Sequence, residues 1–516
     1  MDVNNAKKKM RIGFIHPDLG IGGAERLVVD AAVALQRRGH DVVMFTSRHD
    51  PTRCFPETID GTLTVHVLGS FLPRTLHPRL PLTIVFSILR SLTLAFLLIF
   101  SLLLPGPPTP MNPLSPIEPF DIFFIDQQSV AIPLLRFMSG TRVVFYCHFP
   151  DKLLSGGWEI NVDAKGQEGM STVERKTGTG SVSVAKRLYR WPIDKLEEVT
   201  TGQSDVVLSN SKFTSRVYAR AFPSLAQRSP RVVYPCVDIK AYQPSERKGK
   251  GEAKVDDAVK QISSDRPTIV SFNRFEAKKN VGLAIRTYAR LGSDKLIPDD
   301  QFRRLRLVIG GGYDSEELDN RHTLAELQSL CEELSLSYHT FGESTMPPSN
   351  LVQVLFILNF SNAQRTYLLT SPTTRCLLYT PANEHFGIVP IEAMSCGLPV
   401  LAADSGGPTE TILDLSTSDS GTGILRPPQA EAWAPALASL IVMTGDERSK
   451  VKEAARARVK DEFSMEKLGS DLEQAFRDAL AMGDLHVYLG DKLIWGGAML
   501  MGTSAVGLAL IIWLSG

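Results

Sequence analysis

The most constraining feature of the chain is a strand, a glycine loop, a helix and a second strand in succession over residues 11–46. An apolar run at 11–16 precedes the loop GIGGAER, and an amphipathic helical pattern ends at Gly39 before the next apolar run. A helix that joins two such strands returns the chain to the same edge of the sheet, so the strands pair in parallel. The opening of the chain therefore predicts an α/β fold.

The same pattern recurs in two series separated by a polar stretch. The first series continues at 121–127, 141–150, 204–211 and 231–238, and the second occupies 268–275, 305–314, 374–381 and 398–407. Because 516 residues exceed what one hydrophobic core usually organises, we predict two doubly wound Rossmann-like domains that face a cleft. The predicted parts are an N-terminal domain at 1–244, a linker at 245–266, a C-terminal domain at 267–465 and a C-terminal helical segment at 466–490.

Two hydrophobic segments, 82–104 and 493–514, depart from the pattern of a soluble chain. Each has the length of about 20 residues that spans a bilayer. The strands on either side of 82–104 should share one sheet, so this segment cannot make a single crossing; it lies in the membrane interface, re-enters, or packs as a buried helix. Segment 493–514 carries no charge and has Trp495 and Trp513 near its ends, which predicts a membrane anchor.

Charge and composition exclude several classes of protein. Lys plus Arg and Asp plus Glu are 56 each, so no excess positive charge favours nucleic acid. The N-terminus has no signal-peptide pattern, and the six cysteines lack CxxC spacing, which indicates domains that face the cytosol. No DxD or HExxH motif occurs, so no metal site is predicted. The stretch 156–184, rich in Gly, Ser and Thr, is expected to be a mobile loop.

Candidate anion sites lie where predicted strands end. Gly22 and Gly23 precede a helix, where backbone amides suit a diphosphate, although a tight structural turn fits them equally well. Arg274 lies at the end of strand 268–275 and Lys279 just after it, near a helix start, where cations oppose the helix dipole unless an anion joins them. A phosphate clamp is the interpretation we favour over solvated charges.

Two glutamates eight residues apart, Glu384 and Glu392, follow strand 374–381 and could accept hydrogen bonds from sugar hydroxyls. The alternative for Glu392 is a stabilising contact with the dipole of a helix that begins at Pro390. His148 ends a predicted strand, where ligands bind in such sheets, although an isolated histidine is more often structural.

Taken together, these motifs resemble the retaining GT-B glycosyltransferases of family 4. The resemblance rests on Gly22 and Gly23, the NRFEAKKN stretch, the glycine triplet at 310–312 and the Glu384 to Glu392 spacing. FYCHFPDKLL and YTPANEHFGIVPIEAMSCGLPV further resemble the dolichol-pathway α-1,3/1,6-mannosyltransferase family. That family extends lipid-linked monomannosyl chitobiose with mannose from GDP-mannose.

The resemblance implies a role for each candidate. Arg274 and Lys279 neutralise the donor diphosphate, Glu384 holds the transferred mannose and Glu392 holds the ribose. Donor contacts are also implied for the segment formed by Gly387, Ile388 and Val389. From the N-terminal, acceptor-binding domain, Gly22 and Gly23 approach the phosphate and His148 lies near the sugar.

The resemblance also implies substrates, partners and location. No cofactor or metal is expected; the partners are GDP-mannose, a dolichyl-diphosphate-linked oligosaccharide, membrane lipid and other dolichol-pathway mannosyltransferases. The expected location is the endoplasmic reticulum membrane, with the catalytic domains on the cytosolic face. The alternatives are another sugar nucleotide or lipid acceptor, a nucleotide-dependent oxidoreductase, which the absence of GxGxxG disfavours, and an inactive scaffold.

Overall fold

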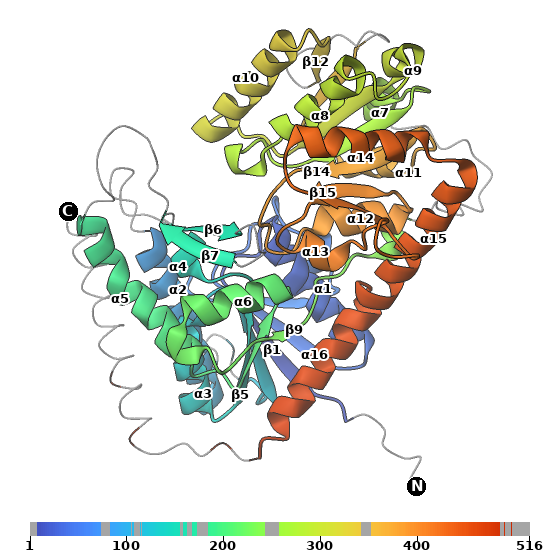
Figure 1. Cartoon of the computed structure of the whole chain (residues 1–516). Helices are drawn as coiled ribbons and strands as arrows, with labels where there is room; N and C mark the ends of the chain where they lie inside the picture. The colour runs from blue at the N-terminus through green and yellow to red at the C-terminus, as the bar shows by residue number, and fades with distance from the viewer. Residues whose placement is uncertain are drawn as a thin grey trace. The chain divides into compact units, whose positions relative to one another are not determined.

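The chain forms two compact units, Met1–Cys236 with Met465–Gly516, and Val237–Ser464 (Figure 1). This computed structural model describes residues 8–73, 83–104, 106–107, 114, 116–154, 158–162, 168–172, 184–242, 257–341, 352–483, 485, 490 and 497. The first boundary thus falls at 236, where 244 was predicted. The segment predicted as a separate helical part after 465 is instead α16 (Met465–Leu480), which returns to the first unit and packs on α1 (Gly23–Arg37).

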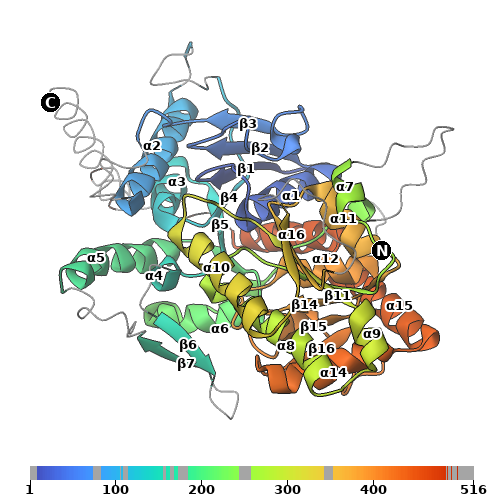
Figure 2. The same ribbon diagram turned by 90° about the horizontal axis from the view of Figure 1, so that it is seen from above.

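The first unit is built on a seven-stranded parallel sheet in the order β3-β2-β1-β4-β5-β8-β9, part of which is seen in Figure 2. The strands are β1 (Arg11–His16), β2 (Asp41–Thr46), β3 (Thr64–Val67), β4 (Ile122–Asp126), β5 (Arg142–Cys147), β8 (Val206–Ser209) and β9 (Arg231–Val232). The central strands are buried on both faces, which is why they read as continuous apolar runs. The predicted shared sheet is confirmed.

Helices cover both faces of this sheet. Side chains of α1 and α16 form one core with Phe14 and Phe124 of the strands, whereas α2, α3 and α6 form the other with Ile15 and Phe123. These helices are α2 (Thr83–Leu103), α3 (Ile132–Ser139) and α6 (Lys212–Ala221), and the unit also holds α4 (Asp151–Leu154) and α5 (Val184–Thr201). Successive side chains of each strand point to opposite faces of the sheet, so they pack into two separate cores.

Helix α2 is the apolar segment predicted at 82–104. It connects β3 to β4 of one parallel sheet, so both of its ends lie on the same side of any membrane. Among the described residues it is the one helix long and apolar enough to span a bilayer, with a mean hydropathy of 2.2, yet half of its most apolar window is buried. Leu89, Leu92, Phe96 and Phe100 form a partly exposed stripe at helical spacing. The helix therefore packs in the fold and also keeps an apolar outer side.

Two predicted loop segments contain secondary structure, and a third predicted segment lies outside the described residues. The stretch predicted as a mobile loop at 156–184 contains an antiparallel hairpin of β6 (Trp158–Val162) and β7 (Glu168–Thr172). The predicted linker at 245–266 includes α7 (Asp257–Ile262). The predicted anchor at 493–514 lies outside the described residues, apart from one isolated position.

The second unit repeats the architecture with the order β12-β13-β11-β10-β14-β15-β16. Its strands are β10 (Thr268–Phe272), β11 (Arg306–Gly311), β12 (Tyr338–Phe341), β13 (Val354–Leu358), β14 (Thr374–Tyr379), β15 (Val400–Ala403) and β16 (Gly423–Arg426). Its helices after α7 are α8 (Gly282–Ser293), α9 (Asp299–Arg304), α10 (Leu318–Glu333), α11 (Asn362–Thr370), α12 (Ile388–Cys396), α13 (Pro408–Thr411), α14 (Ala430–Val442) and α15 (Gly445–Glu462). Two doubly wound units are confirmed.

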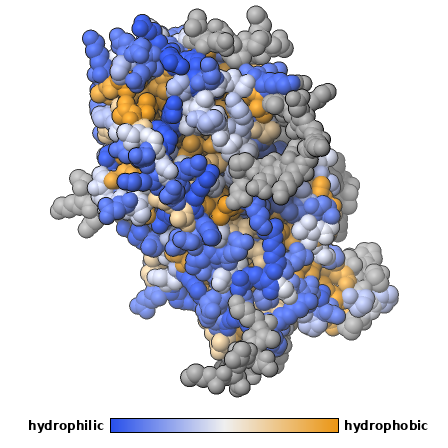
Figure 3. Space-filling model, turned by 90° about the vertical axis from the view of Figure 1, so that its right-hand side faces the viewer, coloured by the Kyte–Doolittle hydropathy of each residue, from blue (hydrophilic) through white to orange (hydrophobic). Residues whose placement is uncertain are grey.

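The apolar side chains are concentrated in these cores. Figure 3 shows a face on which hydrophilic residues predominate and hydrophobic ones gather in small patches. The largest fully buried side chains include Trp433 in the second unit and Tyr146 and Tyr218 in the first. In each unit, the strands whose carboxyl ends carry the candidate residues are therefore packed in a hydrophobic core.

Candidate active site

The loop after β10 is fixed by the glycine triplet at the end of β11. The amides of Asn273 and Phe275 donate to the carbonyls of Gly310 and Gly312, each at 3.1 Å. A Cβ on Gly311 would lie 1.7 Å from the carbonyl oxygen of Asn273, so only glycine permits this approach. The strand predicted to reach residue 275 therefore ends at Phe272, and the following residues form a loop.

Lys279 ends a short 3-10 helix, η5 (Ala277–Lys279), in this loop. The helix predicted to start at Asn280 begins two residues later at Gly282, because Asn280 takes a left-handed conformation with φ of 49°. The hydroxyl of Thr380, just after β14, donates to the Lys279 carbonyl at 2.7 Å. Contacts from the neighbouring strand thus fix the backbone that carries Lys279.

Lys279 and Glu384 form the central ion pair of the second unit. The Lys279 Nζ lies 2.5 Å from Glu384 Oε2, and the two side chains are 20% and 19% exposed. Burial alone would raise the pKa of Glu384, but Lys279 and His385 lower it below its ordinary value. Glu384 is therefore ionised at neutral pH, and the partly exposed pair is still within reach of a ligand.

The glycine turn at 404–407 supports the loop that carries Glu384. The amide of Gly407 donates to the Glu384 carbonyl at 2.7 Å, and Ser405 Oγ accepts from the amide of Asn383 at 3.0 Å. Gly406 has φ of 69°, and a Cβ there would lie 2.4 Å from the Glu384 carbonyl. This turn therefore packs directly against the backbone of Glu384.

The segment formed by Gly387, Ile388 and Val389 starts α12. Gly387 adopts φ of 86°, and a Cβ there would lie 3.1 Å from the ring of Tyr379. Helix α12 begins at Ile388, so the prediction that Pro390 is its first residue is wrong by two positions. Pro390 is tolerated because the first turn of a helix has no internal partner for its amides. The amides of Ile388 and Val389 are placed to meet an anion.

Glu392 lies beyond the first turn of α12, so the helix-dipole alternative does not explain it. Its Oε1 accepts from the Tyr242 hydroxyl at 2.7 Å and from Arg365 at 2.8 Å, while the buried Oε2 has no hydrogen-bond partner within the described residues. Burial raises the pKa of Glu392 against the opposing effect of Arg365. Tyr242 and Arg365 were not predicted as partners of Glu392, because they lie far from it in the chain.

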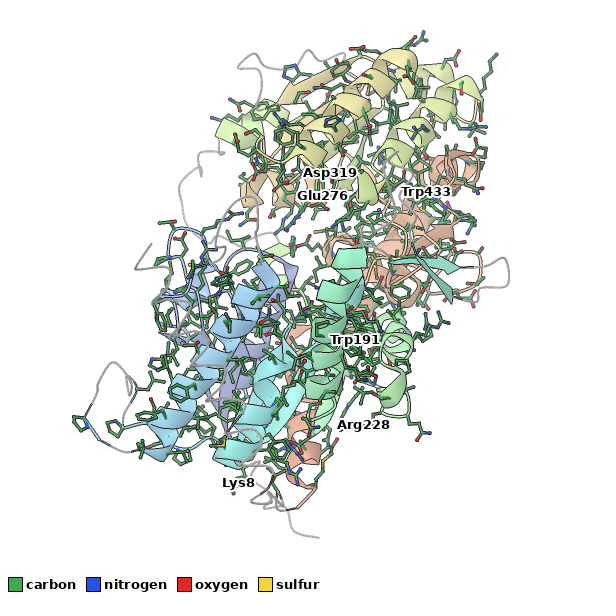
Figure 4. All side chains as sticks on the ribbon, turned by 90° about the vertical axis from the view of Figure 1, so that its left-hand side faces the viewer. Lys8, Trp191, Arg228, Glu276, Asp319 and Trp433 are labelled. Atoms are coloured by element: carbon green, nitrogen blue, oxygen red, sulfur yellow. The ribbon has the colours of Figure 1, made fainter. Side chains whose placement is uncertain are left out.

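Arg274 stands apart from this cluster. Its side chain is 63% exposed, and its guanidinium is 3.6 Å from Glu276, which Lys278 also contacts at 3.1 Å. Glu276 is held near α10, where Asp319 accepts from the amide of Ala277 at 3.4 Å; Figure 4 shows Glu276 and Asp319 close together. The carboxylate contact of Arg274 is thus longer and more exposed than the 2.5 Å pair that Lys279 forms with Glu384.

The remaining candidates lie in the first unit. Gly22 precedes α1 in extended conformation, and a Cβ there would meet the Glu25 carboxylate at 2.2 Å, whereas a Cβ on Gly23 would meet nothing within 4 Å. His148 follows β5, and its Nε2 lies 2.9 Å from Asp126 Oδ2. The partner Asp126 was also missed, although a carboxylate that ends an apolar strand is a visible signal.

The predicted residues therefore divide between the two units. The second holds Arg274, Lys279, Glu384, Glu392 and the start of α12, and the first holds Gly22, Gly23 and His148. In the described part of the chain, no group of three or more His, Cys, Asp or Glu residues is arranged to bind a metal ion.

Two family models match the chain. The family described as "Glycosyltransferase Family 4" matches residues 21–241, and "Glycosyl transferases group 1" matches residues 253–458. Relatives named alpha-1,3/1,6-mannosyltransferase ALG2 occur in Rhizomucor pusillus, 39% identical and covering 98% of both chains, and in Saccharomyces cerevisiae, 36% identical and covering 91% of this chain and 84% of that one.

Solved structures share the fold at low identity. Sucrose-phosphate synthase from Thermosynechococcus elongatus aligns with a TM-score of 0.59 at 19% identity, over 92% of this chain and all of that one. Anabaena HepE, solved in complex with UDP, aligns with a TM-score of 0.56 at 16% identity, over 91% of this chain and all of that one. The predicted GT-B architecture is confirmed.

Proposed function

Because this chain belongs to the alpha-1,3/1,6-mannosyltransferase family of glycosyltransferases, we propose that it transfers mannose from GDP-mannose to dolichyl-diphosphate-linked monomannosyl chitobiose. The transfers form the α-1,3 and α-1,6 bonds that the relatives' name specifies. The observation that carries the proposal is the Lys279–Glu384 pair at the carboxyl edge of the second sheet, beside the start of α12. Ligands of doubly wound sheets bind at this edge.

The chemistry assigned to each side chain follows from its charge. Lys279, Arg274 and the amides of Ile388 and Val389 stabilise the diphosphate as it leaves, which makes a metal unnecessary. Glu384 accepts hydrogen bonds from the mannose and Glu392 from the ribose. The bond between mannose C1 and the diphosphate oxygen breaks as the acceptor hydroxyl oxygen bonds to C1. The hydroxyl proton passes to the departing phosphate oxygen.

The acceptor chemistry requires a membrane surface. A dolichyl chain lies in the bilayer, so its sugar is met at the level of the head groups. Helix α2 offers a partly exposed apolar stripe in the first unit, which suits contact with lipid. We therefore place the enzyme at the endoplasmic reticulum membrane with both units on the cytosolic face, where it meets other mannosyltransferases of the pathway.

The test is an incubation of the purified full chain with GDP-mannose and the lipid-linked acceptor, followed by linkage analysis. We expect products with one and two added mannoses, in α-1,3 and α-1,6 linkage. UDP-glucose and a nicotinamide dinucleotide serve as alternative donors and should give no product. Transfer from UDP-glucose alone, or no transfer with any donor, would overturn the proposal.

A further inference from the structure

Four ionisable side chains of the first unit gather at the carboxyl edge of its sheet. His16 ends β1, Asp126 ends β4, His148 follows β5, and Glu25 lies in the first turn of α1. Asp126 Oδ1 is 2.7 Å from His16 Nδ1, and its Oδ2 is 2.9 Å from His148 Nε2. One buried carboxylate therefore joins two imidazoles from neighbouring strands.

The contacts define how His148 carries its proton. Burial alone would raise the pKa of Asp126, but His16 and His148 lower it, so this carboxylate is ionised. An ionised carboxylate only accepts hydrogen bonds, so both imidazoles donate to it. His148 thus carries a proton on Nε2, which it donates to Asp126, and its Nδ1 can hydrogen-bond another partner.

A buried cation lies on the far side of the carboxylate. Burial alone would lower the pKa of His16, but Asp126 and Glu25, whose Oε1 is 3.9 Å from Nε2, raise it to about 10. His16 is therefore an imidazolium at neutral pH and offsets the charge of Asp126. The charge that His148 experiences depends on His16 although the two rings do not share a hydrogen bond.

We propose that Asp126 and His16 are positioning residues for His148. Asp126 holds the ring of His148 in one tautomer and orientation, and the His16 cation on the other side of that carboxylate offsets its charge. Among the described residues, Asp151 of α4 also interacts with His148 electrostatically, and the ring centre of Tyr146 lies 4.9 Å away. A part for His148 in mannose transfer rests on the proposed function, whereas its positioning does not.

The test follows the reaction of His148 with diethyl pyrocarbonate, which modifies neutral imidazole, as a function of pH in the folded full chain. The modified peptide is quantified by mass spectrometry. His16→Asn keeps a donor for Asp126 and removes the cation, so the midpoint of the labelling curve should rise by about one pH unit. Asp126→Asn removes the adjacent anion, so the midpoint should fall, because Asp126 contacts His148 directly.

The matched control is Asp205→Asn. Asp205 is a second buried carboxylate of the same unit, but it accepts from Arg136, Arg142 and the amide of Val143, away from His148. This variant should lose thermal stability and leave the labelling curve of His148 unchanged. Equal shifts in all three variants, or no shift in the His16 and Asp126 variants, would overturn the proposal.

A kinetic measurement tests the consequence for transfer. Asp126→Asn should lower kcat about 10- to 100-fold and leave the KM for GDP-mannose nearly unchanged, as expected for loss of a group that orients a reactive one. If the labelling midpoint of His148 shifts as expected but kcat does not change, Asp126 positions His148, but His148 takes no part in the transfer. A labelling curve that does not shift contradicts the positioning itself, whatever the rate.

Discussion

Replacing Lys279 by Met separates the catalytic from the structural part of the Lys279–Glu384 pair. Loss of one donor to a developing negative charge costs about 2.7–4 kcal/mol, or 10²- to 10³-fold in kcat. The same change leaves Glu384 mostly buried without its 2.5 Å partner, which should cost about 1–3 kcal/mol of folding stability. For a unit of this size, that loss lowers Tm by about 2–12 °C.

A double variant resolves the two effects. Lys279→Met with Glu384→Gln removes the unpaired charge, so Tm should recover relative to Lys279→Met while transfer stays lost. Lys278→Met is the control, because Lys278 is 74% exposed and contacts only Glu276 among the ion pairs described. The assays are the initial rate of mannose transfer and thermal unfolding. Transfer that recovers together with Tm would refute a catalytic part for Lys279.

The pair also predicts a pH dependence of stability. The pKa of Glu384 is lowered in the folded chain, so its contribution is present above the ordinary glutamate pKa and is lost as the pH falls through the lowered value. Glu384→Gln should therefore flatten the loss of stability of the second unit in acid. An unfolding series across acidic pH that is identical in both proteins would contradict this.

Three further predictions concern metal, membrane and orientation. Transfer should persist in EDTA, and complete loss that a divalent ion restores would show that cationic side chains are insufficient. Charged replacements of Leu89 and Phe100 on the partly exposed stripe of α2 should weaken vesicle binding without unfolding. Charge at the fully buried Leu98 should instead unfold the first unit, and equal effects of the two changes would remove the stripe from membrane contact. Asn359 begins the glycosylation sequon Asn-Phe-Ser but should carry no glycan, because it faces the cytosol in our proposal and its side-chain amide hydrogen-bonds the backbone of Tyr313 at 2.7 and 2.8 Å. Mass spectrometry of protein from cells would reveal a glycan.

The order of elements was predictable because buried parallel strands read as apolar runs that end in polar residues. Polar residues at strand ends also pointed to Lys279 and Glu384 as candidates, since both follow strands that end at one edge of the second sheet. Helix boundaries were less predictable: the left-handed Asn280 delays α8, and the conformation of Gly387 starts α12 before Pro390. Such shifts depend on local backbone contacts that the residue pattern does not encode.

Contacts between distant residues account for most of what was missed. Tyr242 lies 150 residues from Glu392, and no local pattern links the two. The apolar face of α16 was visible, but which core it covers depends on the fit against α1. The hairpin of β6 and β7 was hidden by a composition typical of loops.

Hydrogen exchange of the full chain with and without GDP-mannose tests directly whether the donor binds at the carboxyl edge of the second sheet. We predict slower exchange in the peptides that cover 273–280 and 383–392, and no change in those from α15. Exchange that is unchanged in both site peptides at saturating donor, or protection confined to the first unit, would contradict the account.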